Sequence, residues 1–329
     1  MSAHSHEQAG THGHPHSHGH GHGHGHGHGH GHGHGHGHGH THDGIDWAAM
    51  VDDLRRDDAM SADANAEIAR RLVALIPAGV EATVLDIGAG AGGQSVAFAR
   101  ELLARGGGSL VIVDAVPELL EAAQQAVKVA LDGDDRVRVR TVHADAAAAD
   151  FGAGIPAADL VWASRMVHHL PDQQAGTARL AGLLRPGGWL ALAEGGLSMR
   201  CLPWELGVGA PGLQDRLLAL RDAGFAQMRA DITAATPMPY GWNVALSRAG
   251  LADATSFSVL IDHPAPPAPA VRESVVAWLG GLSERVGERI GDDDRATLAA
   301  LLDPAADTFI GAREDIYILG ATTVFLGRR

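Results

Sequence analysis

The stretch at residues 84–93, VLDIGAGAGG, limits the folds open to this chain more than any other segment. It follows a short β-branched run at 83–87 and leads, through clustered glycines, into a helical spacing of apolar residues over 94–104. An apolar run that stops at glycines is typical of a buried parallel strand. The sequence therefore predicts a unit of strand, glycine loop and helix.

The same alternation of strand and helix continues along the chain. Further strands are predicted at 110–113, 137–142, 160–163, 189–193, 256–261 and 316–326, and helices at 119–131, 172–184 and 242–249. Strands that alternate with helices form parallel sheets with right-handed crossovers and helices on both faces. We predict an α/β fold with a doubly wound, mostly parallel seven-stranded sheet.

Three predicted parts make up the chain. Residues 1–43 form a His/Gly-rich tail with no apolar face, which we expect to be disordered, and residues 44–80 hold cap helices. Residues 81–329 hold the main domain. Its pattern loosens at a lid insertion of about 197–239, with a helix near 213–228, and at a helical insertion of about 264–312.

Composition excludes several classes of function. The formal net charge is -14 and Lys128 is the one lysine, so the broad cationic surface that nucleic acid needs is missing. Cys201 is the one cysteine, which excludes an intramolecular disulfide. No secretion signal and no apolar run of about 18 residues is found. We expect a cytoplasmic enzyme that binds neither membrane nor nucleic acid.

Histidine is concentrated in the tail. All but four of the 22 histidines lie at or before His42, and they alternate with glycine from residue 18 to 40. Imidazole binds divalent Zn, Ni, Co and Cu, so we expect non-specific metal binding by His18, His20, His22, His24 and the rest of the tail. No carboxylate or cysteine is placed to fix one geometry, and a solubilising extension is the alternative.

The glycine loop by itself fits two kinds of cofactor. Gly88, Gly90 and Gly93 match G-x-G-x-x-G, which is also the dinucleotide-binding pattern. Glycines permit a close backbone approach to a ligand, and the helix behind them offers free N–H groups to an anion. A nucleotide and a methionine carboxylate both suit this arrangement.

The residues around the loop separate the two readings. Asp86 stands directly before the glycines, and DIGAGAG at 86–92 resembles the first motif of class I S-adenosylmethionine-dependent methyltransferases. Asp114 ends a VIVD run, HADA follows at 143–146, and HHLPD at 168–172 and LRPGG at 184–188 resemble small-molecule members, including those of quinone and natural-product pathways. The resemblance is strong over 83–194 and weak at the terminal strands, and it implies a Rossmann-like sheet.

The resemblance also implies a cofactor, S-adenosyl-L-methionine, and the residues that bind it. They are Asp86, Gly88, Ala89, Gly90, Gly92, Asp114, Ala115, Asp145, Ala146 and Ser164. Asp114 suits the two ribose hydroxyls, which a carboxylate can accept together, and Asp145 suits the adenine amino group. A helix cap is the alternative for Asp86, and a solvated loop carboxylate is the alternative for Asp145.

Methyl transfer is an in-line displacement, which needs an aligned acceptor and, for a hydroxyl, removal of a proton. His168 and His169 follow the fourth strand, so either is a candidate general base; a structural role is the alternative. Arg165 suits an acidic acceptor or an ion pair. We predict methyl transfer to an O, N or C atom of a small metabolite. A nicotinamide-dependent oxidoreductase, and a metal-binding or storage protein with a non-catalytic methyltransferase fold, are the alternatives.

Overall fold

The computed structural model describes residues 46–329, so the predicted tail and its metal-binding histidines lie outside the described residues. Three helical elements precede the first strand: η1 (Ala48–Met50), α1 (Val51–Met60) and α2 (Ala62–Val73). Ile68 and Leu72 of α2 are fully buried, whereas α1 buries no residue completely. The spacing of apolar residues therefore gave the correct inner face of α2.

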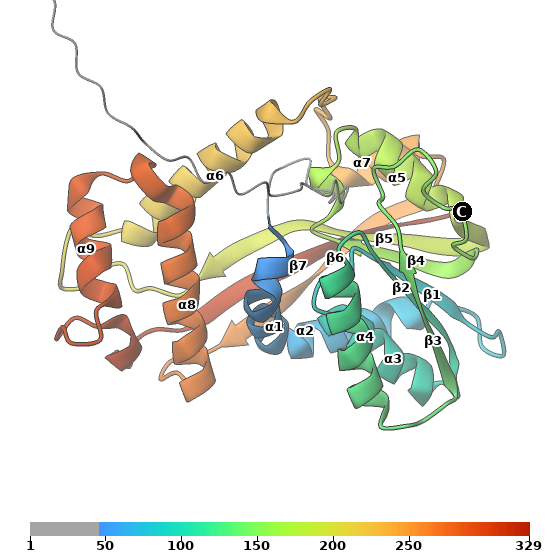
Figure 1. The fold of residues 1–329 in the computed structure, drawn as a ribbon, viewed down its shortest axis with the longest axis horizontal. Coiled ribbons are helices and arrows are strands. Elements are labelled where there is room, and N and C mark those ends of the chain that lie inside the picture. The colour runs from blue at the N-terminus through green and yellow to red at the C-terminus, as the bar shows by residue number, and fades with distance from the viewer. Residues whose placement is uncertain (1–45) are drawn as a thin grey trace, which may run out of the picture. The chain divides into compact units, whose positions relative to one another are not determined.

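A seven-stranded sheet lies at the centre of the described chain (Figure 1). Its strands are β1 (Thr83–Ile87), β2 (Gly108–Asp114), β3 (Val137–His143), β4 (Ala158–Ser164), β5 (Leu184–Arg200), β6 (Ala252–His263) and β7 (Ile318–Arg328), in the order β3-β2-β1-β4-β5-β7-β6. The first five strands pair in parallel, and β7 lies antiparallel between β5 and β6. The prediction of a doubly wound, mostly parallel Rossmann-like sheet is confirmed.

Helices cover both faces of this sheet and continue beyond its end. They are α3 (Gly93–Ala104), α4 (Pro117–Leu131), η2 (Val167–His169), α5 (Gln173–Gly182), α6 (Leu213–Asp231), α7 (Trp242–Arg248), α8 (Pro269–Val286), η3 (Gly287–Arg289), α9 (Asp292–Leu302) and η4 (Ile310–Ala312). Buried side chains of α2, α3 and α4 share one cluster with the sheet, and those of α5 and α7 share another. A third cluster joins α6, α8 and α9 to the ends of β5 and β7.

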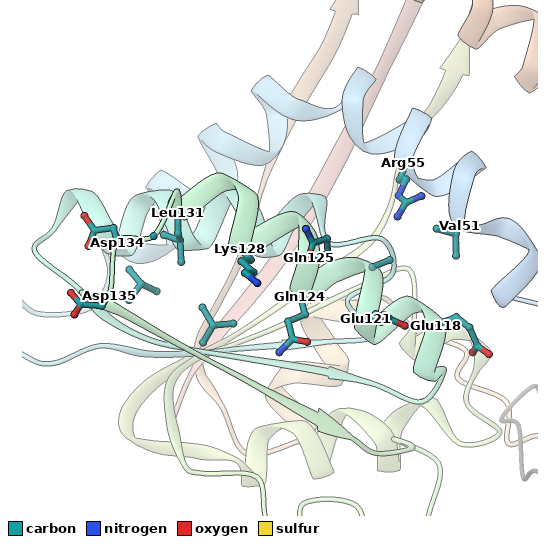
Figure 2. A pocket seen from close by; sticks show the side chains of 14 residues that line it. Val51, Arg55, Glu118, Glu121, Gln124, Gln125, Lys128, Leu131, Asp134 and Asp135 are labelled. Atoms are coloured by element: carbon teal, nitrogen blue, oxygen red, sulfur yellow. The ribbon is translucent and has the colours of Figure 1, made fainter.

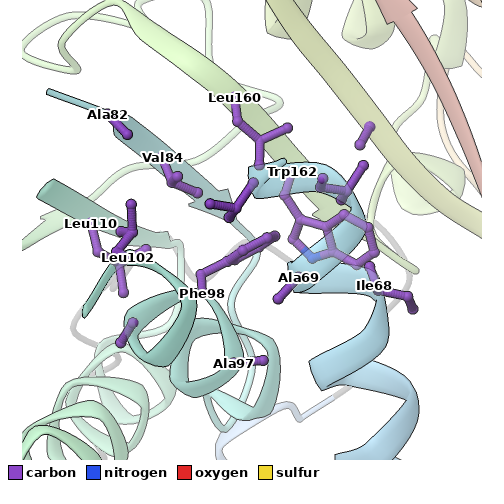
Figure 3. Packing of buried hydrophobic residues seen from close by; sticks show 14 of the residues in the cluster. Ile68, Ala69, Ala82, Val84, Ala97, Phe98, Leu102, Leu110, Leu160 and Trp162 are labelled. Atoms are coloured by element: carbon purple, nitrogen blue, oxygen red, sulfur yellow. The ribbon is translucent and has the colours of Figure 1, made fainter. Parts of the chain in front are cut away.

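An edge-to-face aromatic pair lies in the first cluster. The rings of Phe98 on α3 and Trp162 on β4 have centroids 5.8 Å apart at an interplanar angle of 77° (Figure 3). Figure 3 also shows Ile68 of α2 beside Trp162. Phe98 has no exposed surface and Trp162 is 2% exposed. This contact fixes α3 against the sheet, and the glycine loop leads directly into α3.

The fifth strand is longer than predicted. We predict a strand at 189–193 and the start of a lid at 197–200, but β5 continues to Arg200, with Leu197 opposite Ala321 and Arg200 opposite Leu319 of β7. Gly195 and Gly196 have positive φ and mark a bulge, which imitates a turn in the sequence. A side chain at Gly196 would collide with the carbonyl oxygen of Ala321, so the glycine lets the strands pair closely. Residues 197–200, where the lid was predicted to begin, are therefore part of β5.

Within residues 46–329, no helix has the length and apolar character needed to cross a membrane.

We expect Phe98→Ala to lower the free energy of unfolding by about 3–5 kcal/mol, because it leaves a cavity between α3 and the sheet. Urea titration followed by circular dichroism measures this loss. Val129→Ala is the control, since Val129 lies on α4 and is 67% exposed. An equal, small effect of both substitutions would contradict the proposed role of the Phe98–Trp162 contact.

Candidate active site

The predicted site residues gather at the carboxyl edge of the sheet. In the parallel register, Ile87 at the end of β1 pairs with Val113 of β2 and with Ala163 of β4. The glycine loop, Asp114 and Ser164 therefore leave the sheet at the same level. Ligands of doubly wound sheets bind at this edge, where the strand order reverses. Here the reversal lies at β1, between β2 and β4.

The glycine loop has a backbone that only glycine adopts freely. Gly88, Gly90 and Gly92 have φ values of 70°, 56° and 95°. The N–H groups of Gly88 and Ala89 donate to the carbonyl of Val113, which holds the loop against β2. A Cβ on Gly92 would lie 2.6 Å from the Cα of Ala123 on α4. The loop is therefore closely packed, and it presents backbone without side chains at three positions.

The carboxylate of Asp114, at the end of β2, accepts hydrogen bonds from two loops. Its Oδ2 accepts from the N–H of Gly90 at 3.1 Å and its Oδ1 from the N–H of Val116 at 2.9 Å. The residue is 6% exposed, and this burial raises the pKa of its carboxyl. A carboxylate fixed beside a glycine loop at the end of β2 fits the predicted ribose contact.

Asp86 has a partner within the fold. Its Oδ2 accepts from the Ser95 hydroxyl at 2.5 Å, which ties β1 to the first turn of α3. Burial raises the pKa of Asp86 to about 7, and the hydrogen bond from Ser95 opposes that rise. Because Asp86 is 1% exposed, the structure shows it as a support of the loop. Its direct contact with a cofactor stays a prediction.

The other predicted cofactor residues lie at or beside the same edge. Asp145 follows β3, and its Oδ1 accepts from the N–H of Ala147 at 2.8 Å. Ala146 is 8% exposed and belongs to the second buried cluster. The carbonyl oxygen of Ala115 lies 2.9 Å from Nε2 of His143, and Ser164 is the last residue of β4. Their roles in binding remain predictions.

Asp58 of α1 is a site residue that the sequence did not reveal. Its Oδ2 accepts from the N–H of Gly93 at 2.9 Å, so one of the N–H groups expected to be free for an anion is already bonded. Burial raises the pKa of Asp58 to about 6. A side chain on Gly93 would collide with this carboxylate. In the sequence, the charged residues at 52–58 are typical of a solvated helix face, so the contact between Asp58 and Gly93 was not predicted.

Glu194 orients His168, and it too was not predicted. Its Oε2 lies 2.5 Å from Nδ1 of His168, while its Oε1 accepts from the N–H groups of Met166 at 3.1 Å and Val167 at 2.8 Å. Glu194 is 3% exposed, and it follows directly on the β5 residues that pair with β4. The signal available in the sequence was an acidic residue directly after the predicted strand at 189–193.

The two adjacent histidines have different surroundings. The side chain of His168 is 21% exposed, and its ring makes an edge contact with Phe225 of α6 at 5.4 Å between centroids. The ring of His169 instead makes an edge contact with Trp47 at 5.3 Å. His168 has the carboxylate of Glu194 bonded to its Nδ1. That arrangement leaves Nε2 as its acceptor atom.

Arg165 has a positive φ of 49° at the end of β4. Its positive charge opposes the burial-driven rise in the pKa of Asp57 and of Asp58. This arrangement fits the intramolecular charge pairing that the sequence left open for Arg165.

A groove of about 780 Å³ runs along α4, and it is separate from the site above (Figure 2). Val51 and Arg55 of α1 line it, as do Glu118, Gln124 and Lys128 of α4. It shares no lining residue with the predicted cofactor set. Its mixed charges point to no single ligand.

Within residues 46–329, no group of three or more His, Cys, Asp and Glu side chains is arranged to hold a metal ion. Metal binding by the tail remains a separate prediction.

Residues 84–188 match the family model described as a methyltransferase domain. This match covers about a third of the chain. The buried Asp114 carboxylate beside the side-chain-free Gly90 fits the predicted cofactor, S-adenosyl-L-methionine. The match includes the glycine loop, Asp114, His168 and the first residues of β5.

Two curated relatives are similar over part of the chain. The ubiquinone biosynthesis O-methyltransferase of Leptothrix cholodnii is 33% identical over 110 residues, which are 33% of this chain and 43% of that protein. The 27-O-demethylrifamycin SV methyltransferase of Amycolatopsis mediterranei is 31% identical over 134 residues, 40% of this chain and 45% of that protein. The chain thus spans less than half the length of the curated relatives it matches.

Solved structures resemble the chain at lower identity. The YcgJ protein from Bacillus subtilis is 18% identical, with 80% of this chain and 99% of that chain covered and a TM-score of 0.41. Phosphoethanolamine N-methyltransferase 2 of Haemonchus contortus, solved with S-adenosyl-L-methionine, is 16% identical, with 87% and 60% covered and a TM-score of 0.42.

Gly92→Ala is expected to loosen the glycine loop. We expect it to cost about 1–3 kcal/mol more stability than Gly106→Ala, because the added methyl group overpacks against Ala123. Gly106 is the matched control: its φ is 104° and nothing lies within 4 Å of its Cβ position. Calorimetric titration with S-adenosylhomocysteine should show weaker binding for Gly92→Ala alone. Equal stability and affinity of the two variants would contradict this packing argument.

The buried Asp86 predicts a pH dependence of stability. In the folded protein its pKa is about 7, against 3.8 for the unperturbed group. Between these values the folded state holds a proton that the unfolded chain has lost, so stability is highest below the lower value and falls as pH rises towards 7. In urea titrations at pH 4 to 7.5, Asp86→Asn should lose less stability with rising pH than the parent. The exposed Asp132, changed to Asn, should leave the parent slope unchanged; an unchanged slope in Asp86→Asn contradicts the prediction.

Proposed function

We propose that this chain is an S-adenosyl-L-methionine-dependent methyltransferase that methylates a hydroxyl group of a small metabolite, with His168 as general base. When bound, the cofactor would supply a methyl group attached to a positively charged sulfur, and this sulfur would be the leaving group when an acceptor oxygen attacks the methyl carbon in line. Every other task in this proposal belongs to residues of the chain.

The contact between Glu194 and His168 carries the proposal. A buried carboxylate accepts only, so Nδ1 of His168 holds the proton and Nε2 holds the lone pair. Glu194 is itself held by two backbone N–H groups, which fixes the direction of the imidazole ring. A carboxylate in this position also stabilises the imidazolium that forms when Nε2 takes a proton. This is the arrangement of a base and its orienting group.

Proton removal favours oxygen over the other acceptor atoms. A hydroxyl must lose its proton as the new bond forms, whereas a neutral amine can attack first and lose its proton later. The names of the two curated relatives above, ubiquinone biosynthesis O-methyltransferase and 27-O-demethylrifamycin SV methyltransferase, both refer to an oxygen atom, which supports the same acceptor class for this chain. Phe225 places an apolar ring with 44% exposure beside the base, which suits an apolar or aromatic acceptor.

Asp114, the glycine loop, Asp145 and Ser164 are proposed to hold the cofactor. Asp114 would accept from the ribose hydroxyls, since its carboxylate is already fixed at the end of β2. Among the alternatives, the nicotinamide-dependent oxidoreductase has no support from the matched family or the relatives.

The base assignment predicts a large effect of His168→Gln. Turnover of S-adenosyl-L-methionine to S-adenosylhomocysteine is measured with a panel of phenols, catechols, aliphatic alcohols and amines. For the best acceptor, kcat should fall by about 10²–10⁴-fold in His168→Gln and in Glu194→Gln, because proton transfer is lost or misdirected. His263→Gln is the control, since His263 lies on β6 and contacts the carbonyl oxygen of Met60.

His169→Gln tests the assignment between the neighbours. A loss of turnover in His169→Gln with normal turnover in His168→Gln would transfer the base role to His169. Turnover of amines alone would contradict O-methylation while leaving the cofactor assignment intact.

A further inference from the structure

Helix α6 is anchored mainly at its beginning. Gln214 in its first turn accepts from the N–H groups of Cys201 and Leu202 and donates to the carbonyl of Met199. The buried residues of α6 are Leu213, Gln214, Leu217 and Leu218, all within its first six residues. The remaining two-thirds of the helix contributes no fully buried side chain, and Ile232 directly after it is 4% exposed. Contacts of individual side chains therefore matter more at this far end.

Arg229 makes those contacts, and it makes them to the loop of the proposed base. Its Nη1 donates to the carbonyl of His168 at 2.8 Å and to the carbonyl of Leu170 at 2.7 Å. Among residues 46–329 no carboxylate pairs with this guanidinium, and burial lowers its pKa. Both hydrogen bonds of the Arg229 side chain in the described structure therefore go to the backbone on either side of His169.

The chain that follows α6 approaches the same loop. The N–H of Thr236 donates to the carbonyl of Pro171 at 2.9 Å, and Thr236 forms an isolated parallel bridge with Asp172. One turn before Arg229, Phe225 places its ring against His168. Three contacts from one segment thus converge on residues 168–172.

Two sets of hydrogen bonds therefore hold η2, one at each end of the turn. Glu194 holds the side chain of His168 and the N–H groups of Met166 and Val167 from the sheet side. Arg229 holds the carbonyl groups at the other end of the same turn. A 3-10 turn of three residues, Val167–His169, has few internal hydrogen bonds, so its orientation depends on these outside partners.

We propose that Arg229 is a positioning residue for His168, through which the far end of α6 sets the direction of the imidazole. The catalytic consequence rests on the proposed role of His168 as base. The structural part of the proposal, that Arg229 keeps His168 on Glu194, does not.

The test compares Arg229→Met and Arg229→Lys in the full chain with Arg221→Met. Arg221 is the matched control because it lies on the same helix and bonds to Ser198 and Asp222, away from η2. The first readout is the downfield proton resonance of the His168 Nδ1–H group, assigned by its absence in His168→Gln. The second is steady-state turnover of S-adenosyl-L-methionine with the best acceptor of the panel above, with thermal unfolding as a check on folding.

We expect Arg229→Met to lose or shift this resonance and to lower kcat by about 10²-fold, since small displacements of a catalytic group have effects of that size. The KM for S-adenosyl-L-methionine should stay within about threefold, because the two hydrogen bonds of Arg229 go to His168 and Leu170 and not to a predicted cofactor residue. Arg229→Lys can still donate to carbonyl groups, so it should restore most of the resonance and the turnover. Arg221→Met should behave as the parent protein.

An unchanged His168 resonance in a folded Arg229→Met variant overturns the positioning role, whatever its turnover. A lost resonance together with normal turnover in His168→Gln supports the positioning role and overturns the base assignment. If Arg229→Met does not fold, Arg229→Lys decides: a parent-like resonance supports donation to the two carbonyl groups, and a lost resonance overturns it.

Discussion

Three buried carboxylates hold the carboxyl edge of the sheet in place. Asp86 binds the first turn of α3 through Ser95, Asp114 binds the glycine loop and the start of α4, and Glu194 binds η2. A buried carboxylate is costly without hydrogen bonds, so each one requires its donors to stay in place. The loops that surround the proposed site are therefore ordered by the need to satisfy these three groups, which lie on β1, β2 and β5.

The fold and much of the site could be predicted from local patterns. Strands β1 and β2 were predicted because each is a continuous apolar run bounded by glycine or an acidic residue, as at Ile87 and Asp114. Glu194 and Asp58 were missed for a different reason. Their partners, His168 and Gly93, lie 26 and 35 residues away in sequence, and no local spacing announces such a contact. The end of β5 was missed because two glycines in a bulge resemble a turn.

The structure also changes how the paired histidines are understood. In the sequence His168 and His169 are equivalent, since either follows the fourth strand. In the fold their rings lie 4.2 Å apart between centroids, but they contact different partners: His168 the carboxylate of Glu194, and His169 the indole of Trp47. The difference between the surroundings of the two histidines comes from β5, from the segment before α1 and from α6. The histidine motif alone does not predict contacts with these three parts of the chain.

Strand β5 connects parts of the molecule that would otherwise be independent. It pairs with β4 beside the site, carries Glu194 at that point, and then continues past its bulges to Met199 and the Cys201 cluster that packs α6, α8 and α9. Local opening of the C-terminal helices should therefore release backbone protection along the same strand that holds Glu194. In hydrogen-exchange terms, we expect the C-terminal helices and the edge that carries Glu194 to open as one cooperative unit, because β5 runs through both.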